Sequence, residues 1–193
     1  DKMYKLFIST YSELITIGLF KDNTLIMQKE KESEKSHSIY LVPMIDEILK
    51  ENNIECQDLS EILVVNGPGS FTGIRLGVTV AKTLAYTLNI PIKTISSIEA
   101  ISASIKDDNK IITISDTKGK YLGIFENNQL VNELMYLKNT DYEQYIKNYN
   151  YPIYEDSKLD LQSINNYSLE IAPTPAHAVK AIYIKEIEAL SGR

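Results

Sequence analysis

The chain has 193 residues, of which 44% are hydrophobic and 24% are charged, a composition close to that of average globular domains. Isoleucine, leucine and valine run through most of the length, which excludes global disorder. No stretch approaches the ~18 consecutive apolar residues of a membrane span, so we expect no membrane contact. The 26 acidic and 20 basic side chains give a formal net charge of -6, which excludes a stand-alone nucleic-acid binder with a basic footprint.

Three short runs of β-type sequence come first, at residues 4–9, 14–20 and 24–28. Tight turns separate them, which predicts an antiparallel meander. A mixed-charge run at 29–36 then indicates a strand end and a solvated loop. Apolar residues at helical spacing predict a helix over 38–52, in which Pro43 either lies in the first turns or kinks the helix.

The next segments alternate between strand and helix. A fully apolar run at 62–65 predicts a buried parallel strand, and a long helix is expected over 71–88. A short strand follows at 92–95, and a capped helix runs from there to about residue 105. Asp107-Asp108-Asn109 is the clearest internal boundary.

A second meander follows this boundary, with strands predicted over 110–115, 121–126 and 130–137. The remaining expected elements are a helix over 141–149, a strand at 153–154 and a final helix over 176–190. Both parts of the chain open with three strands, which favours an internal structural duplication. We therefore expect an N-terminal half over 3–106, which carries the glycine loop and the interface helices, and a smaller, divergent half over 107–190.

The segment 66–77, NGPGSFTGIRLG, joins the end of a predicted strand to the start of a helix, a geometry that favours anions. It does not match a P-loop, because no lysine follows the glycines at the required position. It does not match the dinucleotide-binding fingerprint either, because its glycines have the wrong spacing. Two interpretations stay open. In the first, Gly67 and Gly69 form a tight turn and Ser70 caps the helix. In the second, a nucleotide-like loop contacts a ligand through Gly67, Gly69, Ser70 and Thr72.

Asp116 follows an apolar strand and precedes Thr117-Lys118-Gly119. Its carboxylate either forms a turn or joins the nucleotide-like loop by binding a metal–phosphate group. The two histidines have no cysteine or carboxylate at zinc spacing, so we expect no metal site. No catalytic constellation is evident, and we assign no catalytic residue.

The helix over 71–88 carries a row of small residues every four positions and a second row of larger apolar residues. Together they cover more of the helix than the ~100° that packing on a sheet requires. The small row therefore allows a close neighbour, either the helix over 38–52 or a partner protein that covers the apolar surface. The predicted partner interface consists of His37, Leu41, Met44, Gly73, Ile74, Gly77, Val78, Ala81 and Ala85.

The glycine-rich segment 67–77 resembles the signature of the TsaB/YeaZ family, subunits of the bacterial machinery that makes threonylcarbamoyladenosine in tRNA. The resemblance extends to His37-Ser38, to Leu41-Val42-Pro43 and to the segment 96–100. It is strong over roughly residues 3–126 and weak beyond them.

This resemblance implies an α/β chain of the actin/sugar-kinase/Hsp70-like fold, with two ribonuclease-H-like halves of which the second is reduced. It also implies a non-catalytic scaffold that pairs with a catalytic paralogue, TsaD, through the helices over 38–52 and 71–88, as a four-helix bundle. A small ATPase, TsaE, joins the pair. The partner subunits are expected to bind ATP and a metal ion, and this chain is expected to bind no cofactor. It would contact tRNA only through the complex, and it could form a homodimer when isolated.

Two departures from the family pattern bear on activity. Ser9 stands at the end of the first strand, where many relatives have an aspartate that helps to hold the metal of a nucleotide. The turn Asp116-Thr-Lys-Gly119 is one residue shorter than in relatives. The alternatives to a scaffold are an autonomous ATP-binding ATPase or kinase, which would use the glycine loop and Asp116, and a protease that acts on the paralogue.

The compartment is predicted from two features of the sequence. The single cysteine, Cys56, cannot form an internal disulfide, which fits a reducing environment. The first residues show no charged stretch followed by an apolar run of roughly 7–15 residues, so we expect no secretory signal. Both features favour a cytoplasmic protein.

Overall fold

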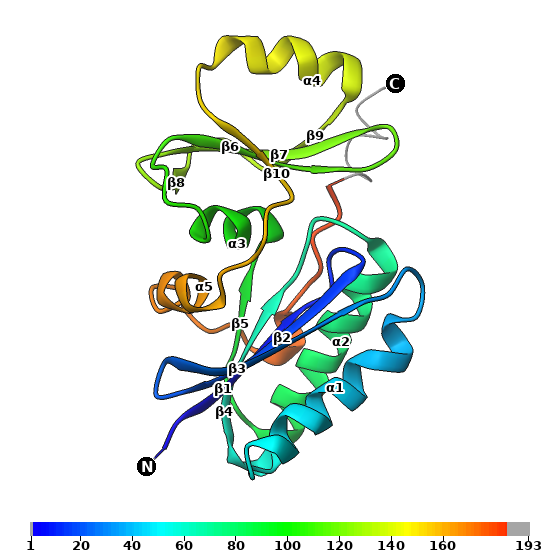
Figure 1. Cartoon of the computed structure of the whole chain (residues 1–193), viewed down its shortest axis with the longest axis vertical. Helices are drawn as coiled ribbons and strands as arrows, with labels where there is room; N and C mark the ends of the chain where they lie inside the picture. Colours follow the sequence, from blue (N-terminus) through cyan, green and yellow to red (C-terminus); the bar gives the residue numbers. More distant parts are fainter. Residues whose placement is uncertain (1, 185–193) are drawn as a thin grey trace.

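The computed structural model describes residues 2–184, which form two lobes stacked along the long axis of the molecule (Figure 1). The first lobe contains a five-stranded sheet in the order β3-β2-β1-β4-β5. Strand β1 lies in its centre, antiparallel to β2 and parallel to β4. The strands are β1 (Tyr4–Ser9), β2 (Leu14–Lys21), β3 (Thr24–Glu32), β4 (Leu59–Val65) and β5 (Ile92–Ile95).

Helices cover both faces of this first sheet. The helices α1 (His37–Glu51) and α2 (Phe71–Leu88) lie side by side on one face (Figure 1). The short helix α5 (Leu161–Ser168) packs on the other face, where the side chain of Leu161 lies over Gly18. Because both faces are covered, the central strands β1 and β4 are almost entirely buried, as expected for such strands.

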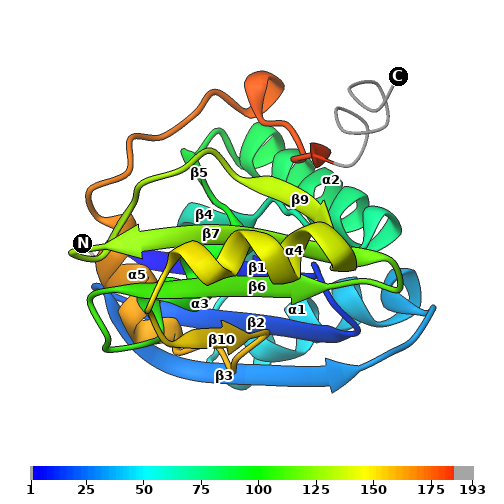
Figure 2. The ribbon, with the colours of Figure 1, turned by 90° about the horizontal axis from the view of Figure 1, so that it is seen from above.

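The second lobe has its own sheet, in the order β10-β6-β7-β8, with β9 also paired to β7. One face packs against α3 (Ser97–Ala103), and α4 (Asn139–Tyr145) lies across the outer face (Figure 2). The strands are β6 (Lys110–Ser115), β7 (Gly119–Glu126), β8 (Gln129–Leu130), β9 (Met135–Lys138) and β10 (Ile153–Glu155). In the described chain as a whole, short 3-10 helices lie at Cys56–Asp58, Ile146–Asn148 and Ala176–Ala178.

The two lobes repeat one element order, which confirms the predicted fold class. Each begins with a meander and continues through a helix to a strand that is parallel to the first strand of the meander, β4 beside β1 and β10 beside β6. Within residues 2–184 the second sheet has no counterpart of β5, so the second half is the reduced one.

The structure corrects several predicted elements. Strand β3 continues to Glu32, into the charged run predicted as a strand end and a loop, because an edge strand can direct charged side chains to solvent. The third strand of the second meander divides into β8 and β9, and helix α5 was missed. Of the final helix predicted over 176–190, the described part shows a 3-10 turn at Ala176–Ala178 and a helical conformation at Ile184, and residues 185–190 lie outside it.

The end of the described chain returns to the first lobe. Beyond α5, the amide of Thr174 donates to the carbonyl of Ile92 at 2.8 Å, and the amide of Ile182 donates to the carbonyl of Asn66 at 2.8 Å. The division of the chain at residue 107 stays a prediction. No helix within residues 2–184 is both long enough and apolar enough to cross a membrane.

Candidate functional site

The glycine loop between β4 and α2 has the strand–loop–helix geometry that the sequence predicts. Gly67 and Gly69 have φ values of 106° and 150°, which side-chain-bearing residues rarely adopt, and the Gly67-Pro68 peptide bond is cis. A Cβ on Gly69 would lie 2.4 Å from the carbonyl oxygen of Tyr11. The loop therefore needs glycine at this position to approach the segment that follows β1.

The polar groups of this loop are largely engaged within the chain. The Ser70 amide donates to the carbonyl of Tyr11 at 2.8 Å, and the Ser70 hydroxyl accepts from the Gly73 amide at 3.4 Å, as a helix cap does. Ser97 donates through its hydroxyl to the carbonyl of Pro68 and through its amide to that of Gly67. These contacts support the turn-and-cap interpretation, and direct ligand contact by the loop stays a prediction.

Asp116 holds the turn between β6 and β7. Its Oδ1 accepts hydrogen bonds from the amides of Lys118 and Gly119, each at 2.9 Å, and from the hydroxyl of Tyr136 at 2.6 Å. These bonds account for an aspartate before Gly119, as in other turns where a carboxylate bonds the backbone that follows it.

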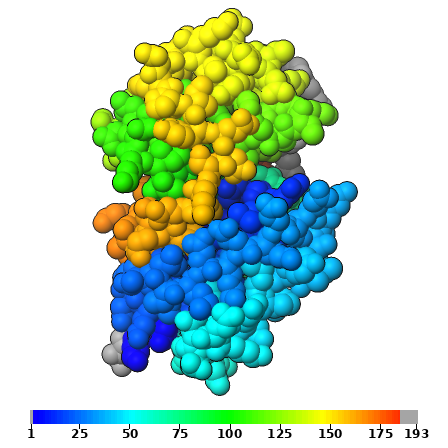
Figure 3. Space-filling view, viewed as in Figure 1, coloured from blue at the N-terminus to red at the C-terminus, as the bar shows by residue number. Residues whose placement is uncertain are grey.

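A cleft of about 1120 Å³ separates the two lobes. The space-filling view shows the waist of the molecule, where the orange segment that follows β10 crosses between the lobes (Figure 3). Gly69, Ser70 and Asp116 line the same cleft from opposite lobes, so the structure brings these three predicted residues together. Gly67 and Thr72 are not among its lining residues.

A hydrogen bond joins the lobes across this cleft. The hydroxyl of Tyr11, after β1, donates to Oδ1 of Asp156, after β10, at 2.9 Å. Burial, together with the adjacent Asp156 carboxylate, raises the pKa of Tyr11 far above its usual range. No local sequence pattern indicates this contact, since the two residues are 145 positions apart.

The shifted pKa of Tyr11 predicts a pH dependence of stability. The folded state holds this proton above pH 10 while the unfolded chain releases it, so the stabilisation is complete below pH 10 and decreases above it. Urea unfolding should show the wild type losing about 1 kcal/mol more than Tyr11→Phe between pH 10 and pH 11. Equal slopes for the two proteins would contradict the assignment.

All nine residues of the predicted partner interface are buried within the chain. A Cβ on Gly73 would lie 2.2 Å from the carbonyl oxygen of Thr10, and one on Gly77 would lie 2.2 Å from the Thr10 hydroxyl oxygen. His37 lies against the carbonyl of Ser12, with its Nε2 2.7 Å from that oxygen. Gly73 and Gly77 of the small row thus pack chiefly on the segment that follows β1, rather than on a partner protein. A part for these residues in pairing stays a prediction.

The apolar side chains that do reach solvent lie elsewhere on the same two helices. The exposed ones are Ile39, Tyr40 and Val42 on α1, and Phe71 and Tyr86 on α2. The row of larger residues on α2, Leu76, Val80, Leu84 and Leu88, is only half-buried. Because α1 and α2 lie side by side, these residues give one outer layer of the first lobe an apolar character.

The cleft contains acidic residues that sequence reasoning missed: Glu13, Glu30, Glu32 and Asp156. The available signal is the alternation of Glu30 and Glu32 along one strand, but a run of mixed charge favours a strand end and a solvated loop. In the described part of the chain, no group of three or more histidine, cysteine, aspartate or glutamate residues is arranged to hold a metal ion.

The two-lobed architecture is that of the actin/sugar-kinase/Hsp70-like fold. Two solved structures from Pseudomonas aeruginosa share the fold. YeaZ gives a TM-score of 0.76 at 15% identity, over 93% of this chain and all of that one. A protein described as similar to peptidase YeaZ gives 0.77 at 16% identity, over 94% and 99%.

The family follows from sequence comparison. The family model for TsaD, tRNA N6-adenosine threonylcarbamoyltransferase, matches residues 26–140, more than half of the chain. The chain belongs to this family.

TsaB from Bacillus subtilis is 38% identical over 122 residues, which cover 62% of this chain and 53% of the relative. TsaB from Buchnera aphidicola subsp. Baizongia pistaciae is 36% identical over 83 residues, covering 42% and 38%. The resemblance to TsaB/YeaZ proteins is thereby confirmed, although the chain spans about half the length, or less, of these curated relatives.

Proposed function

We propose that this chain is a non-catalytic subunit that pairs with a catalytic TsaD-type paralogue and supports threonylcarbamoyl transfer to adenosine in tRNA. Membership of the family supports the proposal. The relatives from Bacillus subtilis and Buchnera are named as tRNA threonylcarbamoyladenosine biosynthesis proteins. The net charge of -6 favours contact with tRNA only through partner subunits.

The observation that carries the proposal is the apolar outer layer of α1 and α2. Ile39 on α1 is 64% exposed and Tyr86 on α2 is 80% exposed, and Leu76, Val80 and Leu84 on α2 are half-buried. Large apolar side chains gathered on neighbouring helices are typical of a surface that another protein covers. Two corresponding helices of a paralogue would complete a four-helix bundle.

A charge on this layer should break the pairing without unfolding the chain. Val42→Asp adds a carboxylate to an exposed position of α1, and we expect it to weaken pairing with the paralogue at least tenfold. The matched control is Val131→Asp, which changes an equally exposed valine in the second lobe. Light scattering of titrated mixtures measures both. Undiminished pairing by Val42→Asp, or the same loss for Val131→Asp, would contradict the proposal.

The proposal places the nucleotide chemistry outside this chain. A TsaE-type ATPase would join the pair, and ATP and a metal ion would bind in the partner subunits. Without its partner, the chain could cover the same apolar layer by forming a homodimer. The complex would work in the cytoplasm, in keeping with the single cysteine.

One observation favours a second candidate, an autonomous ATPase or kinase. Gly69 and Ser70 face Asp116 across the cleft, as a nucleotide site between two lobes requires. Calorimetry of the isolated chain with ATP and magnesium separates the candidates. Micromolar binding that is abolished by Asp116→Ala would favour the ATPase, and its absence favours the scaffold.

A further inference from the structure

The charge of the cleft between the lobes suits a ligand quite different from a nucleotide. We propose that this cleft binds a lysine- or arginine-containing peptide segment of another protein. Lys158 is the one lysine or arginine among the described lining residues, against five carboxylates: Glu13, Glu30, Glu32, Asp116 and Asp156. A triphosphate would meet like charges there, whereas an ammonium or guanidinium group would meet opposite ones.

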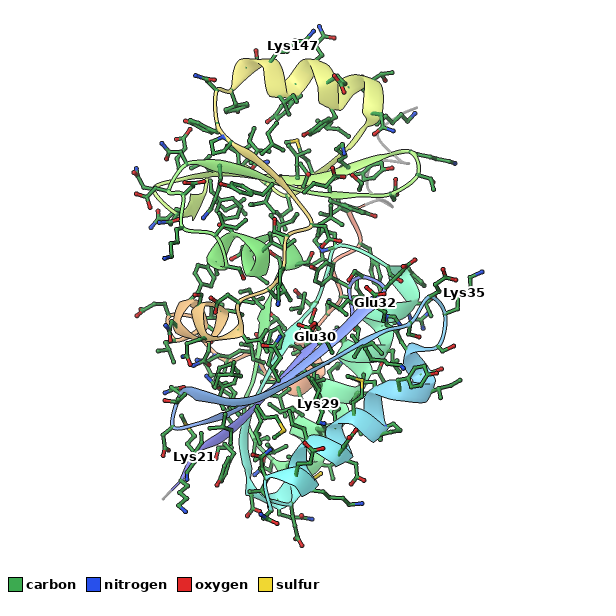
Figure 4. The ribbon with its side chains drawn as sticks, viewed as in Figure 1. Lys21, Lys29, Glu30, Glu32, Lys35 and Lys147 are labelled. Atoms are coloured by element: carbon green, nitrogen blue, oxygen red, sulfur yellow. The ribbon has the colours of Figure 1, made fainter. Side chains whose placement is uncertain are left out.

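Strand β3 separates its charges between its two faces. Side chains alternate along a strand, so Glu30 and Glu32 line the cleft together. Lys29 is on the opposite face, where it pairs with Glu47 and Glu51 of α1. In Figure 4, Glu30 and Glu32 lie along β3 on the side of the waist. Within residues 2–184, neither glutamate forms an ion pair. The Glu30 carboxylate accepts one hydrogen bond, from the neutral side chain of Gln28 at 2.7 Å, so both negative charges can bind an added cation.

Ser9 provides an independent sign of a ligand. Its side chain lines the cleft at the end of β1, is 1% exposed, and its Oγ has no hydrogen-bond partner among the described residues. Buried polar atoms in folded proteins are nearly always paired. The Ser9 oxygen can accept a hydrogen bond from a cationic side chain that enters the cleft.

The remaining walls and the size of the cleft favour a peptide over a small cation. Apolar and aromatic side chains line it, among them Leu14, Phe71, Ile114, Tyr121, Leu159 and Tyr183. Such walls accommodate the aliphatic stems of lysine and arginine, and aromatic faces attract their charged ends. Phe71 already shows this contact, because the guanidinium of Arg75 lies 5.3 Å from its ring centroid. The volume of about 1120 Å³ exceeds the ~300–1,000 Å³ of small-molecule pockets.

Fluorescence anisotropy of a labelled hexalysine peptide with the full chain tests the proposal at physiological salt. We expect the Glu30→Gln/Glu32→Gln double variant to weaken binding at least tenfold. The matched control, Glu133→Gln/Glu170→Gln, removes the same charge from exposed positions outside the cleft and should change binding less than twofold. Backbone amide shifts at Ser9, Thr16 and Ser115 should accompany binding, because these residues line the cleft.

Four results would overturn the proposal. Absence of peptide binding is the first, and equal weakening by both double variants, which would indicate general charge attraction, is the second. Tighter binding of spermidine than of hexalysine would assign the cleft to a small polyamine, and tighter binding of magnesium–ATP would assign it to a nucleotide. None of these results bears on the pairing through α1 and α2, which Val42→Asp tests separately.

Discussion

Replacing Glu61 with glutamine is expected to lower the free energy of unfolding by about 3–5 kcal/mol, the cost of leaving buried charges without their partner. Glu61 Oε2 lies 2.9 Å from Nζ of Lys5, and its Oε1 lies 3.5 Å from Nζ of Lys93. Lys5 is 1% exposed, and Lys93 and Glu61 are also buried. The substitution would leave two lysines in the interior with no carboxylate between them.

This ion network also fixes α5 to the first sheet. Lys5 donates to Oδ1 of Asn165 at 2.7 Å, and Lys93 donates to the carbonyl of Ser168 at 3.1 Å. We therefore expect faster hydrogen exchange in α5 in the Glu61→Gln variant. Urea unfolding measures the stability, with Asp46→Asn as the matched control, because Asp46 forms an exposed pair with Lys50 whose loss should cost less than about 1 kcal/mol. A Glu61→Gln variant as stable as this control would contradict the account.

The second large effect is expected from Gly73→Ala, which should destabilise the isolated chain by about 3 kcal/mol, at the upper end of overpacking costs. The added methyl group would meet the carbonyl oxygen of Thr10 at 2.2 Å, and backbone cannot move aside as a flexible side chain can. Thr10 also donates through its hydroxyl to the carbonyl of Gly73 at 2.6 Å. Thermal unfolding of the isolated chain measures the loss.

Gly77→Ala is the matched comparison, because it adds the same methyl group on the same helix but places it against a different atom of Thr10. At Gly77 the obstacle is the hydroxyl of Thr10, so Thr10→Ala should relieve part of the cost of Gly77→Ala but none of the cost of Gly73→Ala. If the small residues instead faced a partner, the Gly73→Ala and Gly77→Ala monomers would be stable but would fail to pair with the paralogue. That result would contradict the packing on Thr10 and would assign the small residues to the interface.

The sequence predicted the first lobe well because its elements bury strongly apolar, periodic segments. The bounds of α2 and β5 match the structure, and β1 matches as well. Helix α5 was missed because only Leu161 and Ile164 among its buried residues are large and apolar. Its other buried positions, Asn165 and Ser168, are held by hydrogen bonds to distant lysines, which no local pattern reveals.

The candidate site was predicted only in part, for a similar reason. The loop that begins at Gly67 was evident from local residues, because strand, glycines and helix follow one another in the chain. The contact between Tyr11 and Asp156 depends on the packing of the two lobes. The face of α2 was misjudged because small residues suit either a partner or a close approach of the chain's own backbone, and only the position of Thr10 distinguishes the two.

Reconstituted tRNA modification with the purified TsaD-type paralogue and the TsaE-type ATPase tests the central proposal most directly. The measured quantity is the multiple-turnover rate of threonylcarbamoyladenosine formation with and without this chain. We expect the rate to depend on the wild-type chain, to fall with Val42→Asp and to be retained with Val131→Asp. A full rate from the paralogue and the ATPase alone would contradict the scaffold role.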